Sequence, residues 1–178
     1  MATHPSAVLD LAGASQANVT FITGLGHRIY SDDIVRALEI AFGDGADSMT
    51  NQADTKRVEQ FMTTTLDFRV NSLGGALIWD TLQYLAAPLL SAALDQLFHI
   101  LEPGSSMLAY FHDDERASSV PLYSYRIIDQ KTVEVSPKGK TRPAQYFNNR
   151  AIEKLFQRFH SVKFFLIRDH LREVIVRR

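Results

Sequence analysis

The sequence predicts an α/β fold: a three-layer αβα sandwich with a mostly parallel sheet, and an antiparallel hairpin at the C-terminal end. Three observations lead to this prediction. Residues 74–114 contain a buried strand, an amphipathic helix and a second buried strand, which is the unit that builds parallel sheets. Shorter apolar runs alternate with helical patterns before this unit. Two β-rich runs, 162–167 and 173–177, are joined by a short turn near the C-terminus.

Two strands, each followed by a helix, are expected first. The apolar run 7–11 predicts a strand, and the small residues 12–14 allow a tight turn into a helix that Ser15 caps. Residues 27–30 predict the second strand. Asp32 is placed to cap the helix that follows it.

The middle of the chain is expected to supply two more parallel strands. Residues 43–55 lack apolar periodicity and predict a surface loop. A short helix is expected to lead into a third strand at 64–68, with Asp67 at its end. Residues 76–79 predict a buried fourth strand that ends on Asp80.

The second half continues with a helix, a strand and a less regular region. Helically spaced leucines predict a helix over 89–101, and the strand that follows ends on His112. Residues 123–135 predict a hairpin or an irregular insertion, and 137–140 a loop. One more helix precedes the terminal hairpin. Because the sequence has no internal repeat or boundary, we expect one domain over residues 1–178.

Composition excludes several classes of protein and site. With 178 residues, 46% of them hydrophobic, the chain can form a core. The absence of cysteine excludes disulfides, thiol catalysis and cysteine-ligated zinc. No signal-peptide pattern and no membrane-spanning apolar stretch is present, so we expect a cytoplasmic protein without a membrane partner.

Charge is distributed unevenly along the chain. Residues 1–135 hold 8 Lys/Arg against 17 Asp/Glu, whereas 136–178 hold 11 against 3. The stripe Arg150, Lys154 and Arg158 would suit a phosphate-rich partner such as RNA. No aromatic residues interleave with the stripe, so we expect a solvated helix face and no nucleic-acid partner. The asymmetry is then explained by attraction between the two parts, within one subunit or across a homodimer.

The order of the expected elements resembles the class I S-adenosylmethionine-dependent methyltransferases, and three segments resemble them locally. Residues 8–11 (Val-Leu-Asp-Leu) resemble the family's first strand with its aspartate. Residues 78–80 (Ile-Trp-Asp) resemble the fourth-strand motif, and residues 100–104 (Ile-Leu-Glu-Pro-Gly) resemble the turn before the fifth strand. The resemblance implies a Rossmann-like sheet that binds S-adenosylmethionine outside the carboxyl ends of its strands.

The resemblance also implies cofactor-binding residues. Asp32 stands where an acidic residue binds the ribose hydroxyls, and Asp67 where a carboxylate meets the adenine amino group. Gly13 lies in the turn that the cofactor approaches closely. Asp10 and Asp80 are the carboxylates expected near the sulfonium cation. From the residues alone, the alternative is that these aspartates cap helices and turns.

Two residues are candidates for contact with a methyl acceptor. His112 is the candidate general base towards an acceptor hydroxyl or amine, and Tyr84 is the candidate ligand contact. The acidic run 113–115, with Asp80, has oxygen ligands of the kind that hold Mg²⁺. We expect this run to be a solvated loop and expect no metal site.

Two functions follow from these observations. The first is an S-adenosylmethionine-dependent methyltransferase acting on an unidentified small molecule, which the carboxylates at the strand ends favour. The alternative is a catalytically inactive methyltransferase-like module that binds a ligand or a partner. The turn at 12–16 favours this alternative, because it keeps only Gly13 where the family has two or three glycines.

Overall fold

The computed structural model describes residues 4–166 and 170–178 of the chain. Its strands are β1 (Ala7–Asp10), β2 (Arg28–Ser31), β3 (Leu73–Trp79), β4 (Leu101–His112), β5 (Ser119–Asp129), β6 (Thr132–Pro143), β7 (Ser161–Leu166) and β8 (Leu171–Arg177). Its helices are α1 (Gln16–Gly24), α2 (Ile34–Phe42), α3 (Ser48–Asn51), α4 (Thr55–Thr64), the 3₁₀ turn η1 (Thr81–Tyr84), α5 (Ala87–Ile100) and α6 (Asn149–Leu155). Within these residues, one sheet has the order β2-β1-β3-β4-β8-β7, and β5 and β6 form a separate hairpin.

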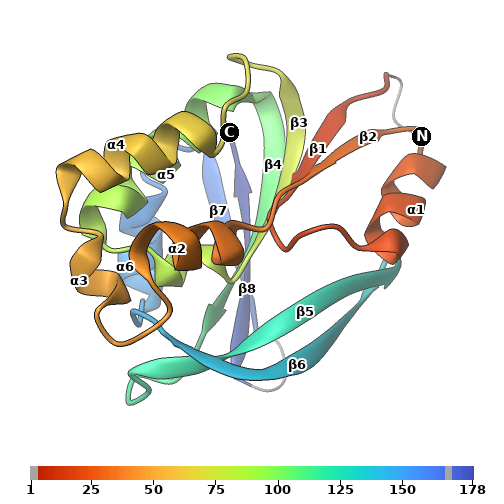
Figure 1. Cartoon of the computed structure of the whole chain (residues 1–178). Helices are drawn as coiled ribbons and strands as arrows, with labels where there is room; N and C mark the ends of the chain where they lie inside the picture. Colours follow the sequence, from red (N-terminus) through yellow and green to blue (C-terminus); the bar gives the residue numbers. More distant parts are fainter. Residues whose placement is uncertain (1–3, 167–169) are drawn as a thin grey trace.

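The main sheet is parallel from β2 to β4 and antiparallel beyond β4. β1 pairs in parallel with β2 and β3, and β3 pairs in parallel with β4. β8 then runs antiparallel to β4, and β7 antiparallel to β8. Figure 1 shows α2, α4, α5 and α6 on one side of the sheet and α1 on the other. The predicted α/β fold with its C-terminal hairpin is therefore confirmed; Ile167, the predicted end of one hairpin strand, lies outside the described residues.

Two apolar clusters hold these layers together. The larger cluster lies between the sheet and the helices α2, α4, α5 and α6, and α5 contributes a buried face with the spacing that its sequence predicts. The smaller cluster joins α1, the other face of the sheet and the β5–β6 hairpin. Its buried members are Ile22, Trp79, Tyr110, Tyr125 and Ile127. The smaller cluster therefore positions the hairpin on the sheet.

The strand predicted at 64–68 is absent from the described chain, so this prediction is wrong. Helix α4 extends to the start of the segment, because Phe61 buries its inner face. The chain then turns at Leu66, whose φ of 60° is outside the extended region. The Leu66 carbonyl oxygen accepts a hydrogen bond from Gln96 of α5 (2.9 Å). Asp67 is consequently exposed on a loop beside α5, and β2 is left at the edge of the sheet.

Two segments predicted as loops contain regular structure. Segment 43–55 includes α3, and buried Gln52 beside it donates to the Tyr84 carbonyl oxygen (3.0 Å). This long-range hydrogen bond stabilises a segment that has no apolar periodicity. Residues 137–140 belong to β6 rather than to a loop, and Gly139 provides a φ of 72° inside that strand.

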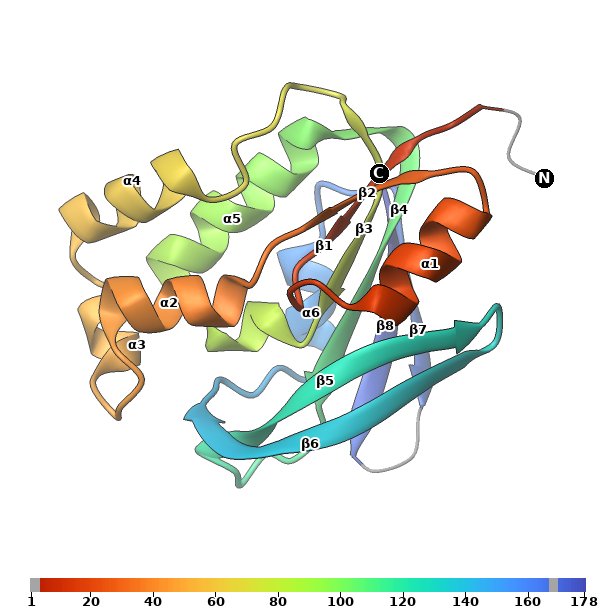
Figure 2. The same cartoon turned by 45° about the vertical axis from the view of Figure 1, so that its right-hand side comes forward.

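The β5–β6 hairpin crosses the carboxyl ends of β3 and β4. In Figures 1 and 2 it lies below the sheet, at the edge where these two strands end. In parallel α/β sheets, ligands bind outside this edge. Any ligand that binds there has the hairpin as one wall of its site.

Candidate functional site

The turn after β1 forms the floor of the candidate site. Gly13 has a φ of 87°, which side chains other than glycine rarely tolerate, and its N–H donates to the Asp32 carbonyl oxygen (3.0 Å). A Cβ at Gly13 would lie 3.4 Å from the Asp33 Cβ. Ser15 then caps α1 as predicted, accepting from the Asn18 N–H (3.5 Å). The backbone of this turn therefore requires glycine at position 13.

A cavity of about 480 Å³ lies between this turn and the hairpin. The turn and Asp33 line one wall; the hairpin residues on the other wall are Ser124, Tyr125, Arg126, Glu134 and Lys138. We call this space the Gly13 cavity. Its volume is typical of small-molecule sites. Arg126 and Glu134 form an exposed ion pair (2.9 Å), so both signs of charge surround the cavity.

Asp33, and not Asp32, lines the Gly13 cavity and caps α2. The Asp33 Oδ1 accepts from the Arg36 N–H (3.0 Å), and its Oδ2 lies beside Gly13. The predicted cap at Asp32 is wrong by one residue, because the Asp32 backbone extends the pairing of β2 with β1. Its N–H donates to the Asp10 carbonyl oxygen (2.8 Å). The contact of Asp32 with a ribose stays a prediction.

Asp10 is fully buried and accepts three hydrogen bonds. Its Oδ1 accepts from Trp79 Nε1 (2.7 Å) and from the Ala12 N–H (3.1 Å), and its Oδ2 accepts from Asn18 Nδ2 (2.8 Å). Both carboxylate oxygens are therefore bound by groups of the protein. Asp10 connects β1, β3 and α1 at the carboxyl edge, and its contact with a cofactor stays a prediction.

Asn18 connects this edge to the hairpin. Its side chain is fully buried, and Nδ2 also donates to the Tyr125 carbonyl oxygen (3.2 Å). Its Oδ1 accepts from the Ile127 N–H (2.8 Å). We did not predict this residue; its only local signal is a polar side chain in the short apolar helix α1.

Asp80, Tyr84 and His112, all predicted site residues, come together in a buried cluster. The Asp80 Oδ2 accepts from the Tyr84 hydroxyl (2.5 Å) and lies 3.4 Å from His112 Nε2. Gln83 Oε1 accepts from the His112 backbone N–H (3.0 Å) and fixes the end of β4 against η1. Asp67 is not part of this arrangement, because its loop follows α5.

Two hairpin tyrosines cover the cluster. Tyr125 stacks on Trp79, with ring centroids 4.7 Å apart and planes 7° apart. Tyr123 stacks on His112, with centroids 5.6 Å apart and planes 16° apart. Trp79 also has a φ of 54°, a sparsely populated conformation that occurs often at functional sites. A molecule that reaches Asp80 must therefore pass or move the hairpin.

Three buried polar atoms around this cluster have no hydrogen-bond partner within the described residues. They are Gln83 Nε2, the Tyr125 hydroxyl and Arg142 Nη1, although Arg142 Nη1 also lies 3.7 Å from Glu39 Oε1 in an ion pair. The Arg142 guanidinium lies 5.9 Å from the centre of the Tyr84 ring, and burial lowers the pKa of Arg142. Unpaired buried groups in a native protein indicate bound water or a ligand. Gln83 Nε2 and the Tyr125 hydroxyl can both donate, so the interior beside these two groups suits a molecule with oxygen acceptors, whereas Glu39 already faces the Arg142 guanidinium.

We expect Tyr84 and Tyr125 to make the fold sensitive to alkali. Burial, followed by the nearby Asp80 carboxylate, raises the pKa of both hydroxyls far above the usual value. In the unfolded chain a tyrosine loses its proton at about pH 10. Above that pH the folded state binds more protons, so the free energy of unfolding falls by about 1.4 kcal/mol per pH unit for each tyrosine.

Urea unfolding at a series of alkaline pH values measures this slope. The contribution of these two tyrosines to the free energy of unfolding should be fully present below about pH 10 and should be lost as the pH rises above it. Tyr84→Phe and Tyr125→Phe should each make the slope shallower, and the double variant should do so additively. Slopes equal to that of the wild type would contradict the assignment.

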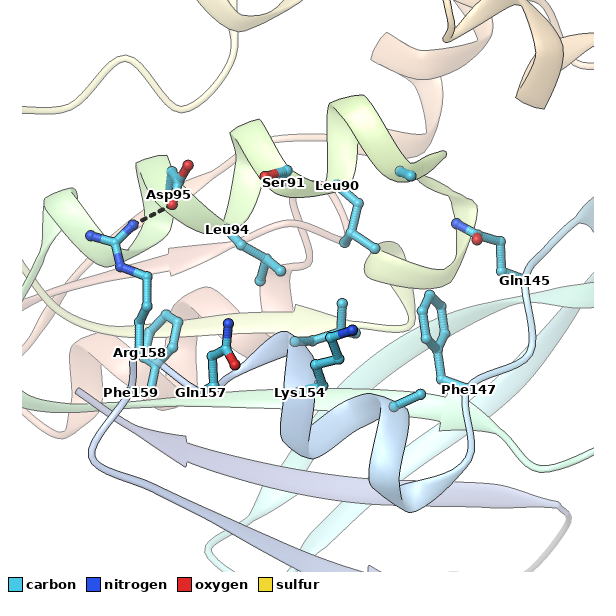
Figure 3. Close-up of a pocket in the computed structure, with 13 residues that line it drawn as sticks. Leu90, Ser91, Leu94, Asp95, Gln145, Phe147, Lys154, Gln157, Arg158 and Phe159 are labelled. Carbon is cyan, nitrogen blue, oxygen red and sulfur yellow. Dashed lines mark hydrogen bonds and ion pairs between the residues drawn. The ribbon is translucent and has the colours of Figure 1, made fainter.

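A second cavity, of about 410 Å³, lies between α5 and α6 (Figure 3). Its floor is apolar, with Leu94 and Phe147 on opposite sides, and an ion pair between Asp95 and Arg158 closes one end. Lys154 extends over it in the close-up. None of the residues predicted to bind cofactor or acceptor lines this groove.

Across residues 4–166 and 170–178, no three His, Asp or Glu side chains gather as metal ligands. In the acidic run after β4, Asp113 pairs with Arg172 (2.7 Å). No helix in the same residues has both the length and the apolar character needed to cross a membrane.

Solved structures resemble nearly the whole chain. The PH0226 protein from Pyrococcus horikoshii OT3 superposes with a TM-score of 0.57 at 12% identity, over 99% of this chain and 83% of that one. An S-adenosylmethionine-dependent methyltransferase from Methanosarcina mazei gives 0.53 at 14%, over 99% and 93%. The 1,6-didemethyltoxoflavin-N1-methyltransferase from Burkholderia thailandensis, with bound 1,6-didemethyltoxoflavin and S-adenosylhomocysteine, gives 0.54 at 14%, over 98% and 72%. The fold is that of the S-adenosylmethionine-dependent methyltransferases.

Comparison by sequence alone does not detect this relationship. No family model and no curated protein matches the chain. At 12–14% identity, the structural likeness establishes the methyltransferase fold and no particular reaction. The activity has to be argued from the site.

Proposed function

We propose that this chain is an S-adenosylmethionine-dependent methyltransferase that acts on a small molecule. The observation that supports this most is the Gly13 cavity, which has a volume of about 480 Å³ and lies at the carboxyl end of β1. This is the edge at which α/β sheets bind ligands. The methyltransferase fold and the buried cluster around Asp80 add to this support.

The residues around the Gly13 cavity match the chemistry of the cofactor. Asp33 caps α2 through Oδ1, and its Oδ2 is an acceptor for ribose hydroxyl groups. Arg126 and Lys138, on the hairpin wall, carry charge opposite to that of the cofactor's carboxylate. When bound, the cofactor supplies an electrophilic methyl group on a sulfonium cation, whose charge Asp10 and Asp80 would favour.

The pair formed by Asp80 and His112 is the proposed acid–base element. The 3.4 Å between Asp80 Oδ2 and His112 Nε2 lets the carboxylate orient the ring. His112 would take the proton that an acceptor hydroxyl or amine releases as its oxygen or nitrogen bonds to the methyl carbon, while the methyl–sulfur bond breaks and the neutral thioether leaves. Tyr84 donates to the same Asp80 oxygen and holds it in place. Positioning of the acceptor would supply most of the remaining rate enhancement.

A second candidate is a methyltransferase-fold module that binds the cofactor without turnover. The covering of the acid–base pair supports it, because Asp80 is 5% exposed and His112 7% exposed beneath the hairpin tyrosines. An acceptor reaches His112 only if the hairpin moves. The two candidates agree on cofactor binding and differ on catalysis.

Calorimetric titration with S-adenosylmethionine, and separately with S-adenosylhomocysteine, tests the proposal. Micromolar binding of either compound, followed by methyl transfer in a screen of hydroxyl and amine acceptors, supports the enzyme. Binding with no transfer to any acceptor supports the module. Absence of heat and of any thermal shift at millimolar ligand contradicts both candidates.

A pair of isosteric variants tests which carboxylate holds the ribose. Asp33→Asn keeps the cap of α2 and removes the charge, so we expect cofactor affinity to fall about 10- to 100-fold with little loss of stability. Asp32→Asn is the matched control and should leave affinity unchanged. The reverse result would assign the ribose to Asp32, as the family resemblance implies. Unchanged affinity in both variants would remove the carboxylates from the site.

A further inference from the structure

Strand β2 lies at the edge of the main sheet, and no strand of the described residues pairs with its outer side. The described residues place β1 on its inner side and end the sheet order at β2. A strand predicted at 64–68 would have been a candidate to cover this edge, but that segment is a loop. An open strand edge is a template for pairing with another strand.

The pairing with β1 shows which backbone groups face outward. The Arg28 N–H donates to the Ser6 carbonyl oxygen (2.9 Å), and the Asp32 N–H donates to the Asp10 carbonyl oxygen (2.8 Å). Even-numbered residues of β2 therefore direct their backbone groups towards β1. Because this direction alternates along a strand, Ile29 and Ser31 direct their N–H and C=O groups to the open edge.

The sequence of this strand is complementary to itself when it is reversed. Residues 28–32 read Arg-Ile-Tyr-Ser-Asp, with a cation at one end and an anion at the other. In an antiparallel pair centred on Tyr30, Arg28 of each copy faces Asp32 of the other. Ile29 of each copy then faces Ser31 of the other. These are the two residues whose backbone groups point outward. Backbone pairing and charge pairing therefore select the same register.

An exposed aromatic side chain lies on this strand. Tyr30 is 43% exposed and packs edge-to-face on Phe68, with centroids 5.3 Å apart. Tyr30, Arg28 and Asp32 share one face of the strand, since side chains alternate with a period of two. A partner at this edge would therefore cover an aromatic patch as well as the backbone.

We propose that β2 pairs antiparallel with β2 of a second copy of this chain, about a two-fold axis at Tyr30. The result is a symmetric dimer with one continuous sheet, in which Arg28 of each copy pairs with Asp32 of the other. The charge pattern commits the edge to this occupant, because it fits its own reverse. The proposal does not depend on cofactor binding: none of the residues from Arg28 to Asp32 is among those lining the Gly13 cavity.

Single-cysteine crosslinking tests the register, because the chain has no cysteine of its own. Directly opposed residues of a non-hydrogen-bonded antiparallel pair have Cα atoms about 4.5 Å apart, within disulfide range. Tyr30→Cys should therefore shift from monomer to dimer mass under mild oxidation. Ser31→Cys is the matched control, because Ser31 is adjacent and also exposed, but lies out of reach of its own copy. Equal crosslinking of the two variants, or none in Tyr30→Cys, would overturn the register.

Charge reversal tests the dimer without oxidation. Sedimentation from about 1 µM to about 1 mM protein should show a concentration-dependent dimer for the wild type. Arg28→Glu and Asp32→Lys should each weaken it by about tenfold or more, because like charges then face each other twice. An equimolar mixture of the two variants should regain the dimer as a heterodimer. A wild type that stays monomeric, or a mixture that stays as weak as its components, would reject the proposal.

Discussion

Asp10→Ala is expected to destabilise the fold by about 3–5 kcal/mol. Asp10 is fully buried and accepts from Trp79, Asn18 and Ala12. Removal of the carboxylate takes away the acceptor of buried Trp79 Nε1 and of the part-buried Ala12 N–H, and it leaves Asn18 Nδ2 with the Tyr125 carbonyl oxygen alone. Each of the three donors loses a charge-assisted hydrogen bond. Urea unfolding monitored by circular dichroism measures the change in the free energy of unfolding.

Two further variants make this result interpretable. Asp67→Ala removes an exposed carboxylate that the sequence predicted to play a comparable role, and it should change stability by less than about 0.5 kcal/mol. Asp10→Asn keeps the shape but directs an amide N–H at one of the donors, so its effect should be intermediate. If Asp10→Ala were as mild as Asp67→Ala, Asp10 would not be the structural centre described above. That result would favour a role for Asp10 in ligand binding.

Asn18→Ala is expected to loosen the β5–β6 hairpin and to cost about 3 kcal/mol of stability. The Asn18 side chain bonds to the Tyr125 carbonyl oxygen, to the Ile127 N–H and to Asp10. Its removal leaves each of these buried groups without this partner. Because two of the three belong to the hairpin, the loss should be local as well as global.

Hydrogen exchange separates the local effect from the global one. The Ile127 amide should exchange faster in Asn18→Ala than in the wild type, whereas the Ala109 amide in the centre of β4 should change only as much as global stability does. Asn18→Asp is the matched variant: it keeps an acceptor for the Ile127 N–H but places a second carboxylate against Asp10. We expect this variant to be less stable at neutral pH and to recover on acidification, as one carboxylate takes a proton. Unchanged Ile127 exchange would show that the stacking of Tyr125 on Trp79 suffices to hold the hairpin.

The strand–helix–strand unit was predictable because its pattern is local. Apolar runs ending on Asp80 and His112, joined by a helix with one buried face, have a single reasonable interpretation as parallel strands. Parallel strands bring their carboxyl ends to the same edge, so the meeting of Asp80 with His112 follows from their places in the sequence. Tyr84 joins them because it lies one helical turn after Asp80.

The predictions of the α2 cap and of the strand at 64–68 were wrong where the local sequence favoured two structures about equally. Asp32 and Asp33 are both good caps, and the hydrogen bond from the Asp32 N–H to Asp10 decided for Asp33. Segment 64–68 has strand-like composition, but Leu66 buries its side chain by turning the chain through φ 60°. Leu66 packs in the larger cluster and its carbonyl oxygen accepts from Gln96, and these long-range contacts leave no trace in the local composition.

The β5–β6 hairpin determines how the candidate site is covered. The sequence of the hairpin does not reveal where the hairpin lies on the sheet. The β-rich runs within 123–135 predict a hairpin or an irregular insertion, yet nothing local indicates that Tyr125 stacks on Trp79 or that Ile127 bonds to Asn18. These contacts join residues far apart in the chain, and a single long-range hydrogen bond or ring stack leaves no periodic trace. Local patterns therefore established the sheet and the edge at which a ligand would bind. Long-range packing established the cover over that edge, the burial of Asp80 and His112 beneath it, and the open side of β2.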